Sequence, residues 1–499
     1  MRRWPEATFL TVFACAAFAW IAAILRGHFD GHALVNAEIA MTIAFLALAA
    51  LRAHPSPHAP ASPPNRWIGP LICLAIPIAY AGVTRAGFLY DDFFHVAGAG
   101  RTTWTSALAG FGPVPNPPGL FFRPLGFLFH WWNYLAAGRD PSFWHAVNLA
   151  LHALNGLLIL AFCRALRFTP AASAAAALLF ALNAAAVESA TWIDARFDPM
   201  AAAFALACLL SLLHRRIAAA ALLAALAVLC KESAFCLPLL AAALLFFRRR
   251  QEWPQLVRGI AMVTAVSCAM FAYRWWALGG LGGYRAPSGE ALATRLDIAH
   301  SLKAVLIQDW TIMFFPVNWL QPMGPATLAV ALLAPAILAA CAWRSAIERR
   351  VLLGALALTL AAALPVHNML LIGPDLSGGR VLYMLSIGWA VLWAGLFGAN
   401  PRPWLVAAVI AWHAVMLRHN LGAWLERHEE AKAVCASFAA EIRNEPDPVS
   451  VQGLPQKKGG VVFLANGFSD CVGRYIEIRE DGAMFVWNAK PERLQRRAP

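Results

Sequence analysis

The stretch FWHAVNLALHALNGLLILAFC, residues 143–163, contains no Asp, Glu, Lys or Arg over 21 residues. A helix of about 20 apolar residues crosses the hydrocarbon core of a bilayer. Similar runs recur along the 499-residue chain, which is 60% hydrophobic and 13% charged. A soluble domain carries about 25% charged residues, so this composition excludes a soluble enzyme. Because the runs lack the two-residue alternation of a transmembrane β-barrel, they predict an all-α polytopic membrane protein.

Thirteen transmembrane helices are predicted from these runs. They cover residues 7–25, 33–51, 67–84, 143–163, 170–187, 198–213, 217–230, 233–247, 259–278, 325–343, 351–366, 381–398 and 403–417. The first run follows Arg2 and Arg3, but residues 26–30 form a poor signal-peptide cleavage site, so we expect a retained span. The apolar segment 304–320 is predicted to be re-entrant or interfacial, because a crossing there would place the basic residues 344–350 outside.

The charges in the loops predict the orientation of the chain. If Met1 is cytoplasmic, the cytoplasmic loops hold sixteen arginines and three glutamates. This is the positive-inside pattern, so the excess of 40 Lys and Arg over 27 Asp and Glu reflects orientation and not nucleic-acid binding. We expect a multi-pass protein of the bacterial inner (cytoplasmic) membrane, with a cytoplasmic N-terminus and a periplasmic C-terminal domain.

The composition divides the chain into three parts: an N-terminal transmembrane hairpin (1–66), a transmembrane bundle (67–418) and a small α+β domain (419–499). The last part holds eleven basic and eleven acidic residues, with an amphipathic helix pattern over 421–442. Strand-like runs follow at 461–465, 475–478 and 483–487. In an oxidising periplasm Cys435 and Cys471 could form a disulfide; two buried free thiols are the alternative.

The long outer loop 85–142 contains the most distinctive motif, Tyr90-Asp91-Asp92-Phe93-Phe94-His95. A carboxylate in half-buried aromatic surroundings suits a general base for a hydroxyl group. A plain acid pair favoured by a helix N-terminus is the alternative. A divalent metal at Asp91, Asp92 and His95 is a weaker hypothesis, and no cofactor is predicted.

Polar side chains inside the span 143–163 form a second pattern. His145, Asn148, His152 and Asn155 fall on one helix face, which must contact protein or a cavity because lipid would leave their hydrogen bonds unmade. Asn155, deep in the span, favours interhelical hydrogen bonding. His145, near the outer surface, could equally line a substrate pocket.

Further charged residues gather at the predicted outer face. They are Arg123, Glu188, Asp194, Arg196, Asp198, Lys231 and Arg380. A cleft lined by carboxylates and basic groups would suit a substrate with a hydroxyl at one end and a phosphate at the other. Ordinary loop ion pairs are the alternative for any single residue. The glycine-rich loop 279–289 is interpreted as a lid or a plain connector.

The order of the motifs resembles the GT-C superfamily of polytopic glycosyltransferases, close to protein O-mannosyltransferase-like proteins. The similarity covers about residues 67–400, without the tetratricopeptide repeats of the animal relatives. The motifs are Asp91-Asp92, Phe122-Arg123-Pro124-Leu125, Asp140 to His152, Leu179 to Leu182, Glu188 to Asp198, Lys231-Glu232-Ser233-Ala234 and Arg380-Val381-Leu382-Tyr383.

This resemblance implies an outward-facing enzyme that moves a sugar from polyprenyl phosphate to a hydroxyl of a periplasmic protein or glycolipid, with inversion at the anomeric carbon. It implies Asp91 as the base, with Asp92 orienting the base or the acceptor. Arg123, Lys231 and Arg380 are the expected ligands of the donor phosphate. The expected substrate pocket includes His95, His145, Glu188, Asp194, Arg196 and Asp198.

Two other functions fit a polytopic protein with buried polar residues: a transporter or flippase of lipid-linked sugars, and a non-catalytic membrane assembly protein. A carrier is expected to place polar sites at mid-membrane in paired halves. Here the acids gather at one face and the sequence shows no internal repeat, while a purely structural role leaves Asp91 and Asp92 unexplained. The transferase is therefore the favoured hypothesis.

Overall fold

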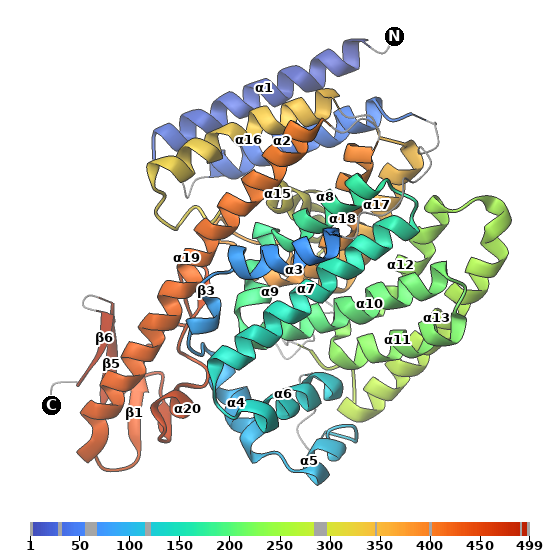
Figure 1. Cartoon of the computed structure of the whole chain (residues 1–499). Coiled ribbons are helices and arrows are strands. Elements are labelled where there is room, and N and C mark those ends of the chain that lie inside the picture. Colours follow the sequence, from blue (N-terminus) through green and yellow to red (C-terminus); the bar gives the residue numbers. More distant parts are fainter. Residues whose placement is uncertain are drawn as a thin grey trace.

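The computed structural model describes residues 3–27, 32–54, 67–114, 121–283, 297–344, 347–398, 402–489 and 492–496. Long helices form a bundle, and a small sheet-containing region packs at one end of the longest helix (Figure 1). Residues 284–289 of the glycine-rich loop lie outside the described residues, as do the short gaps within the N-terminal hairpin.

Within the described ranges, ten helical segments are long and apolar enough to cross a membrane. They contain α1 (Arg3–Leu25), α2 (His32–Leu51), α7 (Pro141–Ala165), α8 (Pro170–Ala181), α10 (Phe197–Leu213), α13 (Trp253–Leu278), α16 (Pro325–Arg344), α17 (Arg349–Ala363), α18 (Leu382–Gly398) and α19 (Pro403–Glu441). Three shorter apolar helices, at 68–79, 217–230 and 232–247, occupy the remaining predicted spans. The predicted fold class, a polytopic helical membrane protein with a small α+β part, is confirmed.

Local sequence signals set the beginning of two central helices. Asp140 caps α7 by accepting a hydrogen bond from the Ser142 amide at 3.0 Å, and Pro141 is its first residue. Thr169 and Pro170 begin α8 in the same way. Proline suits this first position because its φ is helical and it has no N–H to leave unpaired. Helix α18, which has no charged residue, is buried along almost its whole length at the centre of the bundle.

The N-terminal hairpin is joined to the bundle through a buried carboxylate. Glu38 in α2 accepts hydrogen bonds from the indole nitrogens of Trp20 and Trp319, each at 3.1 Å. Trp319 belongs to the segment 304–320, which contains a π-helical turn (Ala304–Gln308) and the short helix α15 (Asp309–Phe314). This segment is not among the membrane-length helices, and residues 309–315 are all buried in the protein. The structure thus gives Glu38 two partners that the sequence did not indicate.

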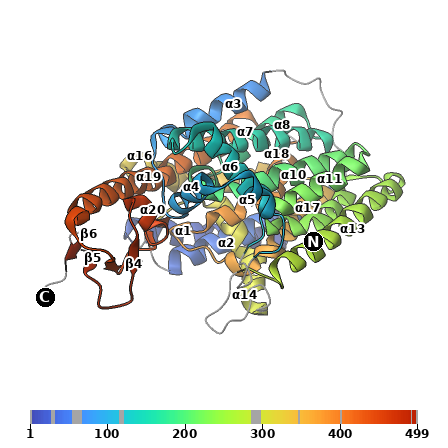
Figure 2. The ribbon, with the colours of Figure 1, turned by 90° about the horizontal axis from the view of Figure 1, so that it is seen from below.

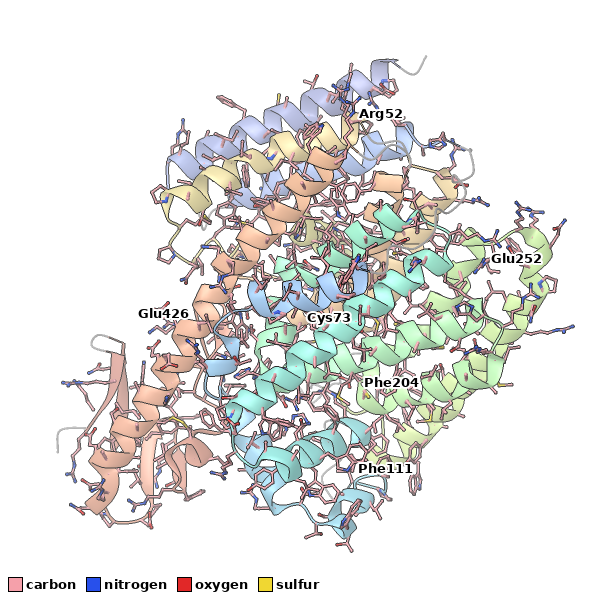
Figure 3. All side chains as sticks on the ribbon, viewed as in Figure 1. Arg52, Cys73, Phe111, Phe204, Glu252 and Glu426 are labelled. Carbon is pink, nitrogen blue, oxygen red and sulfur yellow. A yellow bond between two sulfur atoms is a disulfide. The ribbon has the colours of Figure 1, made fainter. Side chains whose placement is uncertain are left out.

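The predicted outer loop 85–142 is helical. It contains α4 (Asp91–Arg101), α5 (Trp104–Ala109) and α6 (Pro124–Ala137), which pack at one end of the bundle (Figure 1). In Figure 3, Phe111 from this loop and Glu426 from α19 lie toward one end of the bundle. Arg52 and Glu252, from two predicted cytoplasmic loops, lie toward the opposite end.

Helix α19 continues without a break from the last span into the predicted C-terminal domain. The expected boundary at residue 418 therefore lies inside a helix of 39 residues, and the predicted amphipathic helix 421–442 is its second half. The composition becomes more charged there because the helix leaves the bundle, while its backbone structure does not change. Phe438 on this half packs against Phe468 and Phe485, with ring centroids 5.5 and 5.1 Å apart.

Among the described residues, the C-terminal region contains six short strands, of which the sequence indicated three. They are β1 (Val449–Gln452), β2 (Lys457–Lys458), β3 (Val461–Val462), β4 (Ile476–Ile478), β5 (Phe485–Ala489) and β6 (Glu492–Arg496). One sheet has the order β4-β1-β5-β6, in which β1 is parallel to both neighbours and β5–β6 is antiparallel. A disulfide joins Cys435 of α19 to Cys471 of the short helix α20 (Phe468–Val472). Figure 2 shows α20 beside α4.

Candidate active site

The site is organised by the N-terminus of α4, where the two adjacent acids occupy the first turn. Tyr90, just before the helix, has a φ of +48°, a conformation that L-residues rarely adopt. The Asp92 carboxylate accepts a hydrogen bond from the Leu89 amide at 3.0 Å, which fixes the entry of the chain into the helix. Negative side chains are also favoured here by the helix dipole.

The two acids have different surroundings. Asp92 is fully buried, and its second oxygen accepts a hydrogen bond from the Asp194 amide at 2.9 Å. Burial raises the pKa of Asp92 well above its ordinary value. Both oxygens of Asp92 therefore bind main chain, so this residue holds α4 against the segment 193–196. Such a position suits orientation of the neighbouring Asp91 and not contact with a substrate.

Asp91 is only half-buried. One of its oxygens, Oδ1, accepts a hydrogen bond from the Asn466 side-chain amide at 2.5 Å. Burial, together with the nearby Asp194 carboxylate, raises the pKa of Asp91 above its ordinary value. A carboxylate with a raised pKa is a stronger base than a free one, which is the property that proton removal from a hydroxyl requires.

Asp194, whose charge acts on Asp91, lies close to two histidines. His95 Nδ1 lies 2.5 Å from Asp194 Oδ1, and His130 Nε2 lies 3.7 Å from the same oxygen. Burial acts to lower the pKa of His95, but the Asp194 carboxylate outweighs it and the pKa is raised. For His130, burial and the Arg196 charge lower the pKa to about 3. The Asp194 carboxylate thus favours the protonated form of His95, whereas burial favours the neutral form of His130.

The three residues expected to bind a phosphate are each paired with a carboxylate. Arg123 binds Glu232 through two nitrogens, with Nε 2.8 Å from Oε2. Lys231 pairs with Asp198, and Arg380 pairs with Glu188. We refer to these three contacts as the outer ion pairs. Their residues come from five places in the chain: the beginning of α6, the 188–198 segment, the turn after α11 (Ile217–Cys230), and the short helices η4 (Glu232–Cys236) and η10 (Gly379–Val381).

The outer ion pairs and Asp91 belong to one electrostatic cluster. Burial lowers the pKa of Lys231, although the Asp198 carboxylate opposes that change, and the charges of Arg123, Glu232 and Arg380 also act on it. The Arg380 charge acts on Asp91 as well. The charge of Arg380 therefore acts on both Asp91 and Lys231, and the charge of Arg123 acts on Lys231.

Other predicted pocket residues are bound to main chain. Arg196 is fully buried, donates to the carbonyl oxygens of Ile193 at 3.1 Å and Trp144 at 3.0 Å, and lies over the Trp144 ring. His145 Nε2 lies 3.0 Å from the Gly87 carbonyl oxygen. These contacts hold the segments around the site together. Glu188, Asp194 and Asp198 are the counter-charges of Arg380, His95 and Lys231.

In the described ranges, no three His, Cys, Asp or Glu side chains are grouped as metal ligands. The side chains of Asp91, Asp92 and His95, which the weaker hypothesis assigns to a metal, do not all face one point. Asp92 faces main-chain amides, and His95 faces Asp194.

Two members of the site were not predicted from the sequence. Glu232 follows Lys231 directly in the sequence, but its pairing with Arg123 depends on the fold, because 109 residues separate the two partners. Asn466 lies in the C-terminal region, 375 residues from Asp91. No motif around Asn466 signals this contact.

The fold and the site define a polytopic membrane protein with a carboxylate and paired basic groups at one end of its helices. No family model matches the chain. It is 31% identical over 172 residues to Protein O-mannosyl-transferase Tmtc1 of Drosophila melanogaster, and 27% identical over 180 residues to Protein O-mannosyl-transferase TMTC3 of Mus musculus. Each match covers 32% of this chain and 20% of the relative, so the chain spans about a fifth of their length.

The chain therefore resembles proteins named as O-mannosyltransferases, as its motifs predict. Among solved structures, it is similar to the crystal structure of ArnT from Cupriavidus metallidurans bound to undecaprenyl phosphate. The TM-score is 0.46 at 12% sequence identity, over 83% of this chain and 86% of that chain.

Proposed function

We propose that the protein is an inverting membrane glycosyltransferase that moves a sugar from a polyprenyl-phosphate donor to a hydroxyl group of a protein or glycolipid. The observation that supports this most is the position of Asp91. It is a half-buried carboxylate with a raised pKa, in one electrostatic cluster with Arg123, Lys231 and Arg380. The relatives named as protein O-mannosyltransferases support the same class of reaction.

In the proposed reaction, Asp91 removes the proton from the acceptor hydroxyl. The freed oxygen lone pair attacks the anomeric carbon of the sugar from the face opposite the phosphate. The bond between that carbon and the phosphate oxygen breaks, and its electron pair leaves with polyprenyl phosphate. Because phosphate is already a good leaving group, one base and positive charge around the phosphate are sufficient.

The outer ion pairs would bind the donor phosphate without being fully broken. A guanidinium carries five N–H donors, more than one carboxylate can accept. Arg123 and Arg380 can therefore keep Glu232 and Glu188 while they bind phosphate oxygens. The carboxylates orient the cations before the donor arrives, which lowers the ordering cost of binding.

We place this site on the periplasmic side of a bacterial inner membrane. The proposal rests on the arginine excess in the opposite loops. The acceptor would then be a hydroxyl of a periplasmic protein or a glycolipid. The reaction as proposed needs no cofactor.

The test is sugar transfer from radiolabelled polyprenyl-phosphate mannose by purified full-length protein, with membrane lysate as acceptor source. Asp91→Asn keeps the size of the side chain and removes the base, so transfer should fall by about two orders of magnitude or more. Asp481→Asn, at an exposed position of the C-terminal region, is the matched control and should transfer as the wild type does. Thermal unfolding of all three proteins should be similar.

Wild-type transfer that survives in Asp91→Asn would show that another group is the base. If the wild type transfers none of a panel of labelled donors but moves them across vesicles, the carrier hypothesis replaces the transferase. The labelled band distinguishes a protein acceptor from a lipid.

A further inference from the structure

The C-terminal region contacts the helix that holds the predicted base. The Tyr90 amide donates a hydrogen bond to the Phe463 carbonyl oxygen at 3.1 Å. The next contact is the hydrogen bond from Asn466 to Asp91 at 2.5 Å, and Arg101 lies 3.7 Å from Asp470 near the other end of α4. Three contacts from one short segment, 463–470, thus reach both ends of α4.

The segment 463–470 approaches α4 so closely that position 467 requires glycine. Gly467 has a φ of +74°, and a Cβ atom there would lie 2.6 Å from the Tyr90 carbonyl oxygen and 3.0 Å from Phe93 Cβ. Real side chains essentially never come that near, so any larger residue would push the segment away from α4.

The same region also contacts the segment that leads to Arg380. Asn318, in the segment 304–320, donates through Nδ2 to the Gly459 carbonyl oxygen at 3.1 Å, and the amide of the next residue, Trp319, donates to the Pro374 carbonyl oxygen at 2.8 Å. A Cβ on Gly460 would collide with the carbonyl oxygen of Asp375, five residues before Arg380. One folded unit therefore supports both the base and one predicted phosphate ligand.

The segment 463–470 is itself held firmly. The disulfide between Cys435 and Cys471 ties α20 to α19, and the Phe468 ring packs on Phe438. Lys458 Nζ lies 2.5 Å from Glu430 Oε1, also on α19. Asn466 is thus presented by a cross-linked and packed support, although its own side chain is exposed.

We propose that the C-terminal region completes the active site and that Asn466 is a positioning residue for Asp91, an inference that rests on the proposed transferase function. Asn466 donates to one oxygen of Asp91 and leaves the other, Oδ2, to take the proton of the acceptor hydroxyl. A hydrogen bond to a carboxylate is charge-assisted and favours the ionised form.

The test is the pH profile of sugar transfer by full-length Asn466→Ala. The groups whose charges act on Asp91 are Asp194, His95 and Arg380, and none of them changes in this variant. Loss of the amide donor removes an interaction that lowers the pKa of Asp91. The acid limb of the profile should therefore move to higher pH, with turnover about tenfold lower because one charge-assisted hydrogen bond is lost. Asn488→Ala, an exposed asparagine that bonds Gln495 in the same region, should behave as the wild type.

A second variant tests the contact without changing Asn466. Gly467→Ala should reduce transfer because its Cβ would displace the segment from Tyr90. Gly473→Ala is its matched control, since Gly473 has a similar φ of +76° but no atom within 4 Å of a Cβ. Both changes strain the backbone, so only the collision at Gly467 distinguishes them.

The outcomes separate this inference from the proposed function. If the wild type transfers sugar and Asn466→Ala keeps its rate and pH profile, the inference is wrong while the function stands. If the wild type transfers nothing, the function fails, and hydrogen exchange of the amides of residues 88–95 tests the contact directly. Faster exchange in Asn466→Ala and Gly467→Ala than in their controls would support the positioning role; unchanged exchange would overturn it.

Discussion

Two sets of polar residues lie within this largely apolar protein, and their partners differ. The residues on α7 (His145, Asn148, His152 and Asn155) bind mostly main-chain carbonyl oxygens, such as Trp192 at 3.0 Å and Pro199 at 2.9 Å. The outer ion pairs are instead charged side chains that bind one another. The first set uses up its donors within the fold, whereas the second retains donors that a ligand could use.

This difference distinguishes polar residues that stabilise the fold from polar residues that are available to a ligand. A neutral amide that binds a carbonyl oxygen stabilises helix packing and offers little to a ligand. A buried ion pair is a weak source of stability, because desolvation offsets much of the attraction. We therefore expect variants of α7 to affect folding, and variants of the outer ion pairs to affect transfer even after their stability is restored.

The largest effect is expected from Lys231→Met. This change leaves Asp198 buried without its partner, which should cost about 3–5 kcal/mol of stability. Transfer should fall by about a hundredfold, because a cation near the leaving phosphate is lost. Thermal unfolding in detergent and labelled-sugar transfer measure the two effects.

The double variant Lys231→Met with Asp198→Asn tests whether the outer ion pairs have a role in transfer beyond stability. Removal of both charges should return the stability close to that of the wild type. Transfer should stay low. Recovery of wild-type transfer in the double variant would mean that Lys231 only neutralises Asp198.

A smaller effect is expected from Arg380→Lys. Lysine keeps the positive charge but loses the planar fork that binds Glu188 and the stacking over Trp192. Transfer at low donor concentration should fall about tenfold, with unfolding little changed. An equal loss at saturating donor would instead indicate that Arg380 acts on the reaction step and not on donor binding.

The sequence predicted the features that depend on local composition. The spans follow from apolar length, and the residues that cluster at the site, such as Asp91, Arg123 and Lys231, follow from polar groups placed next to spans. The thirteen spans correspond to ten membrane-length helical segments and three shorter helices among the described residues.

What could not be predicted depends on contacts between distant segments. Asn466 meets Asp91 only because α19 carries the C-terminal region to α4, and no local pattern encodes that path. Strands β1, β2 and β6 were missed because they are short or charged, and whether such a segment forms a strand depends on its pairing partner. The continuity of α19 was missed because apolar content falls where the helix leaves the bundle, although its helix-forming residues continue.

The smallest effect is expected from Asn155→Leu in α7. The change removes the hydrogen bond from Asn155 Nδ2 to the Pro199 carbonyl oxygen and leaves that oxygen without this donor. Interhelical hydrogen bonds of this kind contribute about 1 kcal/mol, so unfolding should occur at a slightly lower temperature. Transfer per folded molecule should equal that of the wild type, because Asn155 contacts none of the outer ion pairs. Leu154→Met, on the exposed side of the same helix, is the control for altered packing. A loss of transfer in Asn155→Leu without loss of stability would contradict the division between structural and functional polar groups, since it would place a working residue in the middle of the span.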